Sequence, residues 1–445
     1  MKKITTYVLL VAAFVLAVGF IVAKNNKKQE GFLPLKARTG TLAQSKEYSL
    51  TKSKADALFA QIKKNPADTK SKLGLAALYI QEGRITSDHV YYDVAAMQLA
   101  NDVLKTDSNN FEALVFKGTL YLSQHHFADG LAIAQHVQRV NPYNAFVYGM
   151  LVDANVELGN YDEAVKNSDK MVSVRPDIRS YSRISYLREI YGDNAGAIDA
   201  MKMAVSAGYP GEEGTEWARV HLGQLYESNG DLLAAKMHYT IALQNRPDYA
   251  YAYAGLARIA RSEKNYAQAI SYDLKADSLV VDYAFKDELT DLYALNGETD
   301  KSQETAKKVV AQLAKDAQSG VNDASIGHYA DRELAYAYLK VNEPDKALDH
   351  ALMEYNRRPD NIDVNETLAW VYYNKGDYAN AQKYIKVALK TNSKNPVLLC
   401  HAGLIYIKGG DVAKGKELIN TALQSNPNIS VQLKTEAQKA VQAIS

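Results

Sequence analysis

Similar residues recur at a fixed spacing of 34 along this chain, and this recurrence constrains its fold more than any other feature of the sequence. Tyr338, Tyr372 and Tyr406 follow one another at this spacing, and Pro142 and Pro176 are separated by the same interval. Six of the ten prolines fall at one position of this frame, where proline ends a helix and begins a connection. A period of about 20–50 residues is the signature of a repeat array. We therefore expect the 445 residues to form one array and not two or three separate globular domains.

Each copy of the repeat has the pattern of a helical hairpin. In one copy Leu151 and Leu158 lie on a first apolar stripe at helical spacing, and Ala164 and Met171 lie on a second. A short turn that contains Gly159 separates the two stripes. One hairpin cannot bury both of its faces, so its stability must come from stacking on its neighbours. The pattern predicts an all-α fold.

The frame also predicts how the chain is divided. A superhelix over 53–445 holds ten copies and a last amphipathic helix. The copies lie near 69–110, 111–144, 145–178, 179–212, 216–249, 250–283, 284–327, 328–361, 362–395 and 396–429, and the capping helix covers 430–444. The first and seventh copies are longer than the period. We expect their extra residues, near 85–93 and 317–328, to form longer helices or loops.

The residues at the fixed positions resemble the tetratricopeptide repeat family. The pattern of that family, a small residue followed by Tyr, Gly, an aromatic residue and two Ala, is matched in one copy by Ala369, Tyr372, Gly376, Tyr378, Ala381 and Ala388. The resemblance covers 69–429. It implies a right-handed α-solenoid of about ten hairpins, in which the first helices line a concave groove that binds peptides or partner domains.

The N-terminus has a different character. Residues 4–23 contain no charged side chain, and as a single hydrophobic helix they would span about 30 Å, the thickness of the bilayer core. Two interpretations remain open over 1–23, an uncleaved membrane anchor and a cleaved signal peptide that starts with Lys2 and Lys3. Residues 24–52 follow as a polar tether. We expect the repeats to be exported, in the periplasm if the organism is bacterial; the alternative is an anchored protein whose repeats face the cytoplasm.

No catalytic, cofactor or metal site is predicted. The net charge of +1 lacks the basic excess of a general nucleic-acid binder, and the single cysteine, Cys400, excludes a multi-cysteine zinc site. Residues 410–416 have the spacing of a phosphate-binding loop, but Glu417 follows where Ser or Thr is required, and no strand precedes them. His125 and His126 are adjacent, so on a helix they point in different directions.

The remaining candidate is the concave surface. Its predicted lining mixes aromatic residues with arginine, the types enriched at interface hot spots. The candidate residues are Arg183, Trp217, Tyr251, Arg258, Arg261, Arg332, Tyr336, Trp370 and Tyr373. An alternative role for Tyr336, Trp370 and Tyr373 is to pack neighbouring hairpins together.

The sequence therefore predicts a scaffold that is not an enzyme. It would bind a protein or peptide in its groove, with no cofactor, metal or nucleic acid, and would contact a membrane through residues 4–23 if that segment is retained. The alternatives are a non-catalytic arm or subunit of an enzyme complex and an extracytoplasmic carbohydrate-binding protein.

Overall fold

Local signals in the sequence set where each helix begins and ends. At the turn between two helices of one hairpin, Gly376 adopts the left-handed backbone conformation (φ +78°) that favours glycine. Asp377 then caps the next helix, because its carboxylate accepts a hydrogen bond from the backbone N–H of Asn380 at 3.1 Å. The same order of left-handed glycine and acidic cap recurs at Gly192 and Asp193.

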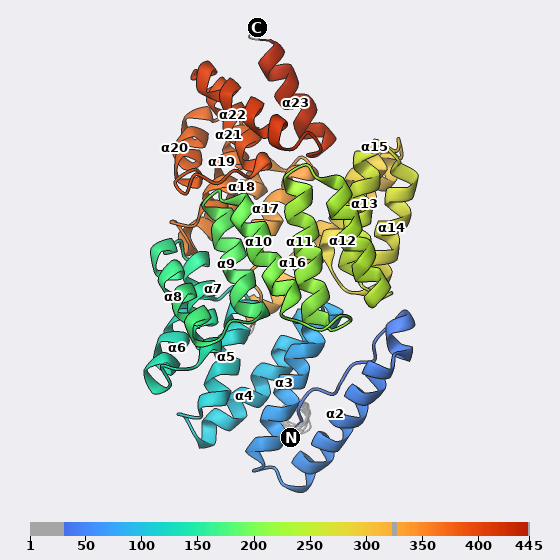
Figure 1. The fold of residues 1–445 in the computed structure, drawn as a ribbon, viewed down its shortest axis with the longest axis vertical. Coiled ribbons are helices and arrows are strands. Elements are labelled where there is room, and N and C mark those ends of the chain that lie inside the picture. The colour runs from blue at the N-terminus through green and yellow to red at the C-terminus, as the bar shows by residue number, and fades with distance from the viewer. Residues whose placement is uncertain (1–30, 323–326, 444–445) are drawn as a thin grey trace, which may run out of the picture. The chain divides into compact units, whose positions relative to one another are not determined.

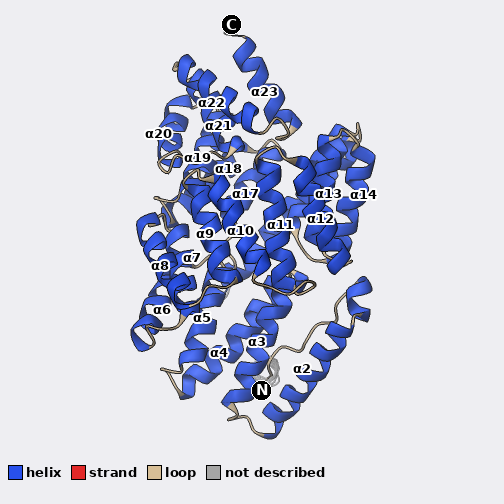
Figure 2. Ribbon diagram, in the orientation of Figure 1, coloured by secondary structure: helices blue, strands red, loops and turns tan. Residues whose placement is uncertain are grey.

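The computed structural model describes residues 31–322 and 327–443, and within these ranges every regular element is a helix (Figure 2). A 3-10 helix, η1 (Gly40–Gln44), precedes α2 (Lys46–Lys64). Helical pairs follow from α3 to α22 (Figure 1). The pairs are α3 (Thr69–Thr86) and α4 (His89–Thr106), α5 (Phe111–Ser123) and α6 (Phe127–Val140), α7 (Ala145–Glu157) and α8 (Tyr161–Val174), α9 (Ile178–Ile190) and α10 (Asn194–Ser206), α11 (Glu213–Ser228) and α12 (Leu232–Asn245), α13 (Ala250–Ser262) and α14 (Tyr266–Leu279), α15 (Tyr283–Leu295) and α16 (Thr299–Asn322), α17 (Asp331–Lys340) and α18 (Pro344–Arg357), α19 (Ile362–Asn374) and α20 (Tyr378–Ala388), and α21 (Pro396–Lys408) and α22 (Val412–Ser425). The predicted all-α solenoid of helical hairpins is confirmed.

Small residues allow the two helices of a hairpin to approach closely. Ala235 of α12 and Ala269 of α14, which occupy the same frame position in successive copies, are both completely buried. The ring of Tyr239, also completely buried, packs between Gly223 of α11 and Gly255 of α13. A Cβ added at Gly223 would lie 2.5 Å from this ring, and one at Gly255 would lie 2.7 Å from it, so both positions require glycine.

The two long copies keep their hairpins and extend their helices. α3 and α4 have 18 residues each, and α16 has 24. These lengths agree with the expectation that the extra residues of the first and seventh copies form longer helices.

The chain divides into two compact units, residues 1–36 and residues 37–445. Residues 37–52, which the sequence placed at the end of a polar tether, lie in the larger unit. The reason is a buried ion pair: the guanidinium of Arg38 donates to the carboxylates of Glu82 and Glu47, and Arg38 is only 5% exposed. Leu42 is also buried, in a cluster with Phe285.

The hydrophobic stretch 4–23 lies outside the described residues. None of the helices in the described ranges combines the length and the apolar character that a membrane crossing requires.

The last helix, α23 (Val431–Gln442), packs against α21 and α22 of the C-terminal hairpin. Leu433 and Ala437 are buried in one cluster with Leu399 and Leu404 of α21, against which Trp370 packs. Ser430 caps the helix by accepting from the N–H of Leu433 at 3.3 Å.

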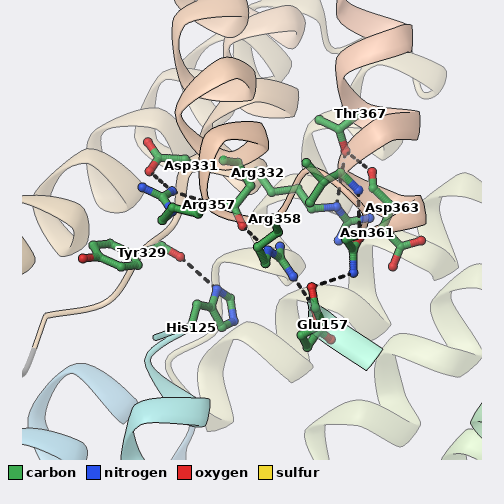
Figure 3. A network of polar contacts seen from close by, with 12 residues as sticks. His125, Glu157, Tyr329, Asp331, Arg332, Arg357, Arg358, Asn361, Asp363 and Thr367 are labelled. Atoms are coloured by element: carbon green, nitrogen blue, oxygen red, sulfur yellow. Dashed lines mark hydrogen bonds and ion pairs between the residues drawn. The ribbon is translucent and has the colours of Figure 1, made fainter. Parts of the chain in front are cut away.

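Hairpins far apart in sequence meet along one edge, which we call the inter-turn seam. Its residues are 125, 126, 157, 159 and 161 on one side and 327, 329, 358 and 360–362 on the other (Figure 3). Glu157 and Arg358, which form an ion pair there, are 201 residues apart, close to six periods of the repeat. The chain therefore comes back alongside itself after about six hairpins.

The contacts of the seam join turns to turns. The side-chain amide of Asn361 donates to the backbone carbonyl of Glu157 at 3.1 Å. The side-chain oxygen of the same residue caps α19 by accepting from the N–H of Val364. The N–H of Ile362 donates to the hydroxyl of Tyr161 at 2.9 Å. His125 donates from Nδ1 to the carbonyl of Tyr329 at 2.8 Å, and burial lowers the pKa of His125 to about 4. The bonds at Glu157 and Ile362 satisfy backbone groups that helix ends leave without partners.

A glycine substitution tests the seam. Gly159 and Gly376 end first helices at equivalent turns with φ of +81° and +78°. A Cβ at Gly159 would lie 2.3 Å from the carbonyl oxygen of Asp360. A Cβ at Gly376 would have no neighbouring atom within 4 Å. Both changes to alanine strain the backbone equally, so we expect Gly159→Ala to reduce the free energy of unfolding by about 1–3 kcal/mol more than Gly376→Ala. Urea denaturation followed by circular dichroism measures the difference; equal losses would contradict the seam.

Candidate functional site

Three adjoining cavities lie along consecutive first helices of the hairpins, and together we call them the groove. The first, of about 410 Å³, is lined by α5, α7 and α9. The second, of about 640 Å³, extends from α7 to α13, and the third, of about 580 Å³, reaches α15. Arg183 and Tyr186 line the first two, and Trp217 and Gln224 line the last two. The shared residues make the groove continuous over six hairpins, from α5 to α15.

Four predicted residues line the groove: Arg183, Trp217, Tyr251 and Arg258. Arg183 of α9 holds Asp153 of α7 through two hydrogen bonds, from Nε at 2.8 Å and from Nη2 at 2.5 Å. This paired geometry fixes the plane of the guanidinium between two successive first helices.

Arg258 of α13 is held in a similar way by α11 and α12. Its Nε donates to Glu227 at 2.9 Å, and its Nη2 donates to the hydroxyl of Tyr239 at 3.2 Å. The Tyr239 hydroxyl in turn donates to Glu227 at 2.7 Å. The positive charge of Arg258 is thereby compensated within the protein.

Aromatic side chains line the second and third cavities beside these ion pairs. The ring of Trp217 lies 3.9 Å from that of His221, centroid to centroid. His221 donates from Nδ1 to the carbonyl of Trp217 at 2.9 Å, and burial lowers the pKa of His221, so its Nε2 is free to accept a hydrogen bond. Tyr251 contacts Ser87 and Asp282 through its hydroxyl, at 2.8 and 3.3 Å.

Three other predicted residues are engaged in contacts between hairpins. Arg261 forms an ion pair with Glu288 of the next first helix. Arg332 donates from Nε to the hydroxyl of Thr367 at 3.3 Å, beside the seam (Figure 3). That hydroxyl also lies 3.4 Å from the hydroxyl of Tyr336.

The last two predicted residues, Trp370 and Tyr373, pack against the cluster that contains Leu433 and Ala437 of α23. Their rings stack 4.8 Å apart, and Trp370 also stacks on His401 at 3.8 Å. The hydroxyl of Tyr373 donates to Glu436 of α23 at 2.7 Å. Both rings pack the C-terminal hairpins together, which is the alternative role that the sequence allows for them.

Sequence reasoning missed Phe285, although the repeat frame contains the signal that would have found it. Arg183, Trp217 and Tyr251 follow one another at the spacing of the repeat, and the next residue in this series is Phe285, which lines the third cavity. Gln224 lines two cavities, and within the described residues its amide has no hydrogen-bond partner.

Asp273 of α14 is a second residue that the sequence analysis passed over. It occupies in the next copy the frame position that Tyr239 occupies in its own, and it too is completely buried. Neither oxygen of its carboxyl group has a hydrogen-bond partner. Burial raises the pKa of Asp273 to about 8; Glu288 and Asp277 add to the increase, and Arg258 and Arg261 oppose it.

The other chemical candidates occupy structural positions. Cys400 is buried in the cluster beneath α23. Gly410 takes a left-handed conformation (φ +95°) at the turn before α22, as expected for a repeat turn. Within the described ranges, no group of three His, Cys, Asp or Glu side chains is arranged to hold a metal ion.

Comparison with known families agrees with this geometry. Residues 221–279, from α11 to α14, and residues 362–395, across α19 and α20, match models of the tetratricopeptide repeat. The protein is an α-solenoid, and these two segments of it match tetratricopeptide repeats, which generally serve protein–protein interaction. No curated protein sequence matches the chain.

Three of the solved structures that match the chain are as follows. One is from the APC/C hetero-tetramer Cut9-Hcn1, with 15% identity over 85% of this chain and a TM-score of 0.43; the match spans 60% of that chain. A thermophilic TPR protein of Thermus thermophilus is 20% identical over 45% of this chain and 98% of its own, with a TM-score of 0.37. PilW, a type IV pilus biogenesis factor, is 15% identical over 46% of this chain and 94% of its own, with a TM-score of 0.39.

The raised pKa of Asp273 predicts how stability depends on pH. An acid whose pKa is about 8 when folded and 3.8 when unfolded destabilises the fold progressively as the pH rises from about 4 to 8. Asp273→Asn removes this penalty. We expect the urea midpoint of the variant to exceed that of the wild type by a margin that grows over this range and is constant above it. A margin independent of pH would show that Asp273 is ionised in the folded protein.

Proposed function

We propose that this protein is a non-enzymatic scaffold that holds an extended segment of a partner protein in the groove. The observation that supports the proposal is the continuity of the groove, whose three cavities are joined by shared residues over consecutive first helices. An extended polypeptide suits this shape because it can place one side chain in each cavity in turn.

The polar groups of the groove suit a peptide backbone. The amide of Gln224 can both donate to a carbonyl and accept from an N–H, and Nε2 of His221 can accept. Tyr186, which is 42% exposed, offers a ring and a hydroxyl at the junction of the first two cavities. The guanidinium groups are already held by Asp153 and Glu227, so they present fixed planes and not unpaired charges.

Photo-cross-linking tests this function. With benzoylphenylalanine in place of Tyr186, we expect adducts that mass spectrometry maps to one continuous segment of a partner. The matched control replaces Tyr209, which is 75% exposed in the connection before α11 and lines none of the three cavities. A synthetic peptide of the segment should compete, and Gln224→Ala should weaken its binding roughly fivefold, for one hydrogen bond of about 1 kcal/mol. Equal labelling from both positions would reject the proposal.

We further propose that the repeats act outside the cytoplasm. They would be tethered to a membrane if residues 4–23 are retained and released if that segment is cleaved. The support is the charge-free length of that segment behind Lys2 and Lys3. Mass spectrometry of the mature N-terminus, with protease accessibility of the repeats in intact cells, distinguishes the outcomes. A retained terminus with protected repeats would indicate the opposite orientation, with the repeats in the cytoplasm.

A further inference from the structure

The third cavity of the groove, which we call the Asp273 pocket, carries an excess of acidic groups. Five carboxyl groups line it, against two guanidinium groups. Both guanidinium groups are already paired, Arg84 with Glu213 at 2.9 Å and Arg258 with Glu227 at 2.9 Å. The pocket therefore has no free guanidinium group of its own with which to balance a further carboxylate.

Most of the acidic groups of the pocket also have partners. Glu288 pairs with Arg261, and Asp287 pairs with Lys340 at 2.9 Å. Asp282 caps α15 by accepting from the N–H of Ala284 at 2.9 Å. Asp273 differs from all of these, since it is completely buried and both its oxygens lack a partner.

The repeat frame shows why Asp273 is unsatisfied. In the preceding copy the same position holds Tyr239, whose hydroxyl reaches across to Glu227 and Arg258. The aspartate side chain is shorter and ends before any such partner. The hydroxyl of Tyr249, which also lines the pocket and is 6% exposed, is a second buried group without a partner. Buried polar groups of this kind are rare in folded proteins and are satisfied when a ligand supplies the missing donor.

Aromatic rings enclose the same space. Tyr251 lies 5.7 Å from Tyr249 and 5.7 Å from Phe285 between ring centroids, and Trp217 lies at the entrance shared with the second cavity. The faces of aromatic rings attract cations, most strongly when water is excluded. A pocket with unsatisfied acceptors and aromatic walls suits a group that combines positive charge, several N–H donors and an apolar stem.

We propose that the Asp273 pocket binds a lysine or arginine side chain of the segment held in the groove, an inference that rests on the proposed function. The cationic head would donate to the carboxylate of Asp273 and to the hydroxyl oxygen of Tyr249, and its aliphatic stem would lie between the rings of Tyr251 and Trp217. Because burial keeps Asp273 protonated in the free protein near neutral pH, binding of the cation ionises it and releases one proton to the solvent.

Calorimetry with a matched pair of probes tests this inference. The probes are acetyl-Ala-Arg-Ala-amide and acetyl-Ala-citrulline-Ala-amide, which have nearly the same shape and differ in charge. We expect the full chain to bind the arginine peptide at least about tenfold more tightly, since a charge-assisted hydrogen bond is lost with citrulline. Titration at pH 7 in two buffers of different ionisation enthalpy should show the release of a proton with the arginine peptide alone.

Two variants and a control make the test specific. Asp273→Asn should reduce the preference for arginine to less than about threefold and abolish proton release. Glu288→Gln should weaken arginine binding while leaving proton release in place. Asp169→Asn, the same chemical change on the exposed face of α8, should leave both unchanged. The inference is overturned if the arginine peptide does not bind, if citrulline binds equally well, or if Asp273→Asn behaves as the wild type.

Failure here can be told apart from failure of the proposed function. If cross-linking from position 186 still identifies a partner segment, but the charge preference is absent, the groove function stands and the cation pocket is rejected. If position 186 gives no specific adduct and the arginine peptide does not bind, both proposals are rejected.

Discussion

The inter-turn seam is the contact that holds copies far apart in the sequence against each other. A row of hairpins stacked only on their neighbours presents an open inner face, but here the turn at Gly159 meets the connection at Asp360 and the chain is held alongside itself. The chain comes back alongside itself at a second place. There Arg84 of α3 and His89 of α4 line the third cavity together with residues of α11 and α15. The third cavity is therefore lined by residues from distant copies, and burial within it raises the cost of an unsatisfied polar group.

The polar groups of the groove differ in how completely the protein satisfies them. Arg183 and Arg258 are each fixed by a carboxylate from the preceding first helix, so they contribute rigid surfaces. Gln224 and Asp273 lack such partners. Asp273 is also completely buried, and a buried group left unsatisfied reduces the stability of the fold, so a ligand that satisfies it recovers that free energy on binding. Under the proposed function, α11, α13 and α14 are the part of the solenoid where we expect a bound segment to make its polar contacts.

The repeat frame predicted much of the fold and part of the site. Because side chains at one frame position face one direction, the series of Arg183, Trp217 and Tyr251 could be placed on the inner surface once the frame was matched to the tetratricopeptide pattern. The frame could not show that α23 would cover Trp370 and Tyr373, since that depends on where the final helix docks. Asp273 was missed because an aspartate on a second helix looks like a solvated residue until its burial is known.

The sequence by itself determined the repeating hairpin, the positions of its turns and the residues that face inward, because these follow from spacing, capping and the conformations that glycine and proline allow. Only the tertiary structure decided which hairpins meet across the solenoid, that residues 37–52 join the larger unit and which inward-facing groups remain unsatisfied. The physical reason is that a small change in the angle between neighbouring hairpins accumulates over six copies. The contacts between distant copies depend on this sum, which no local pattern records.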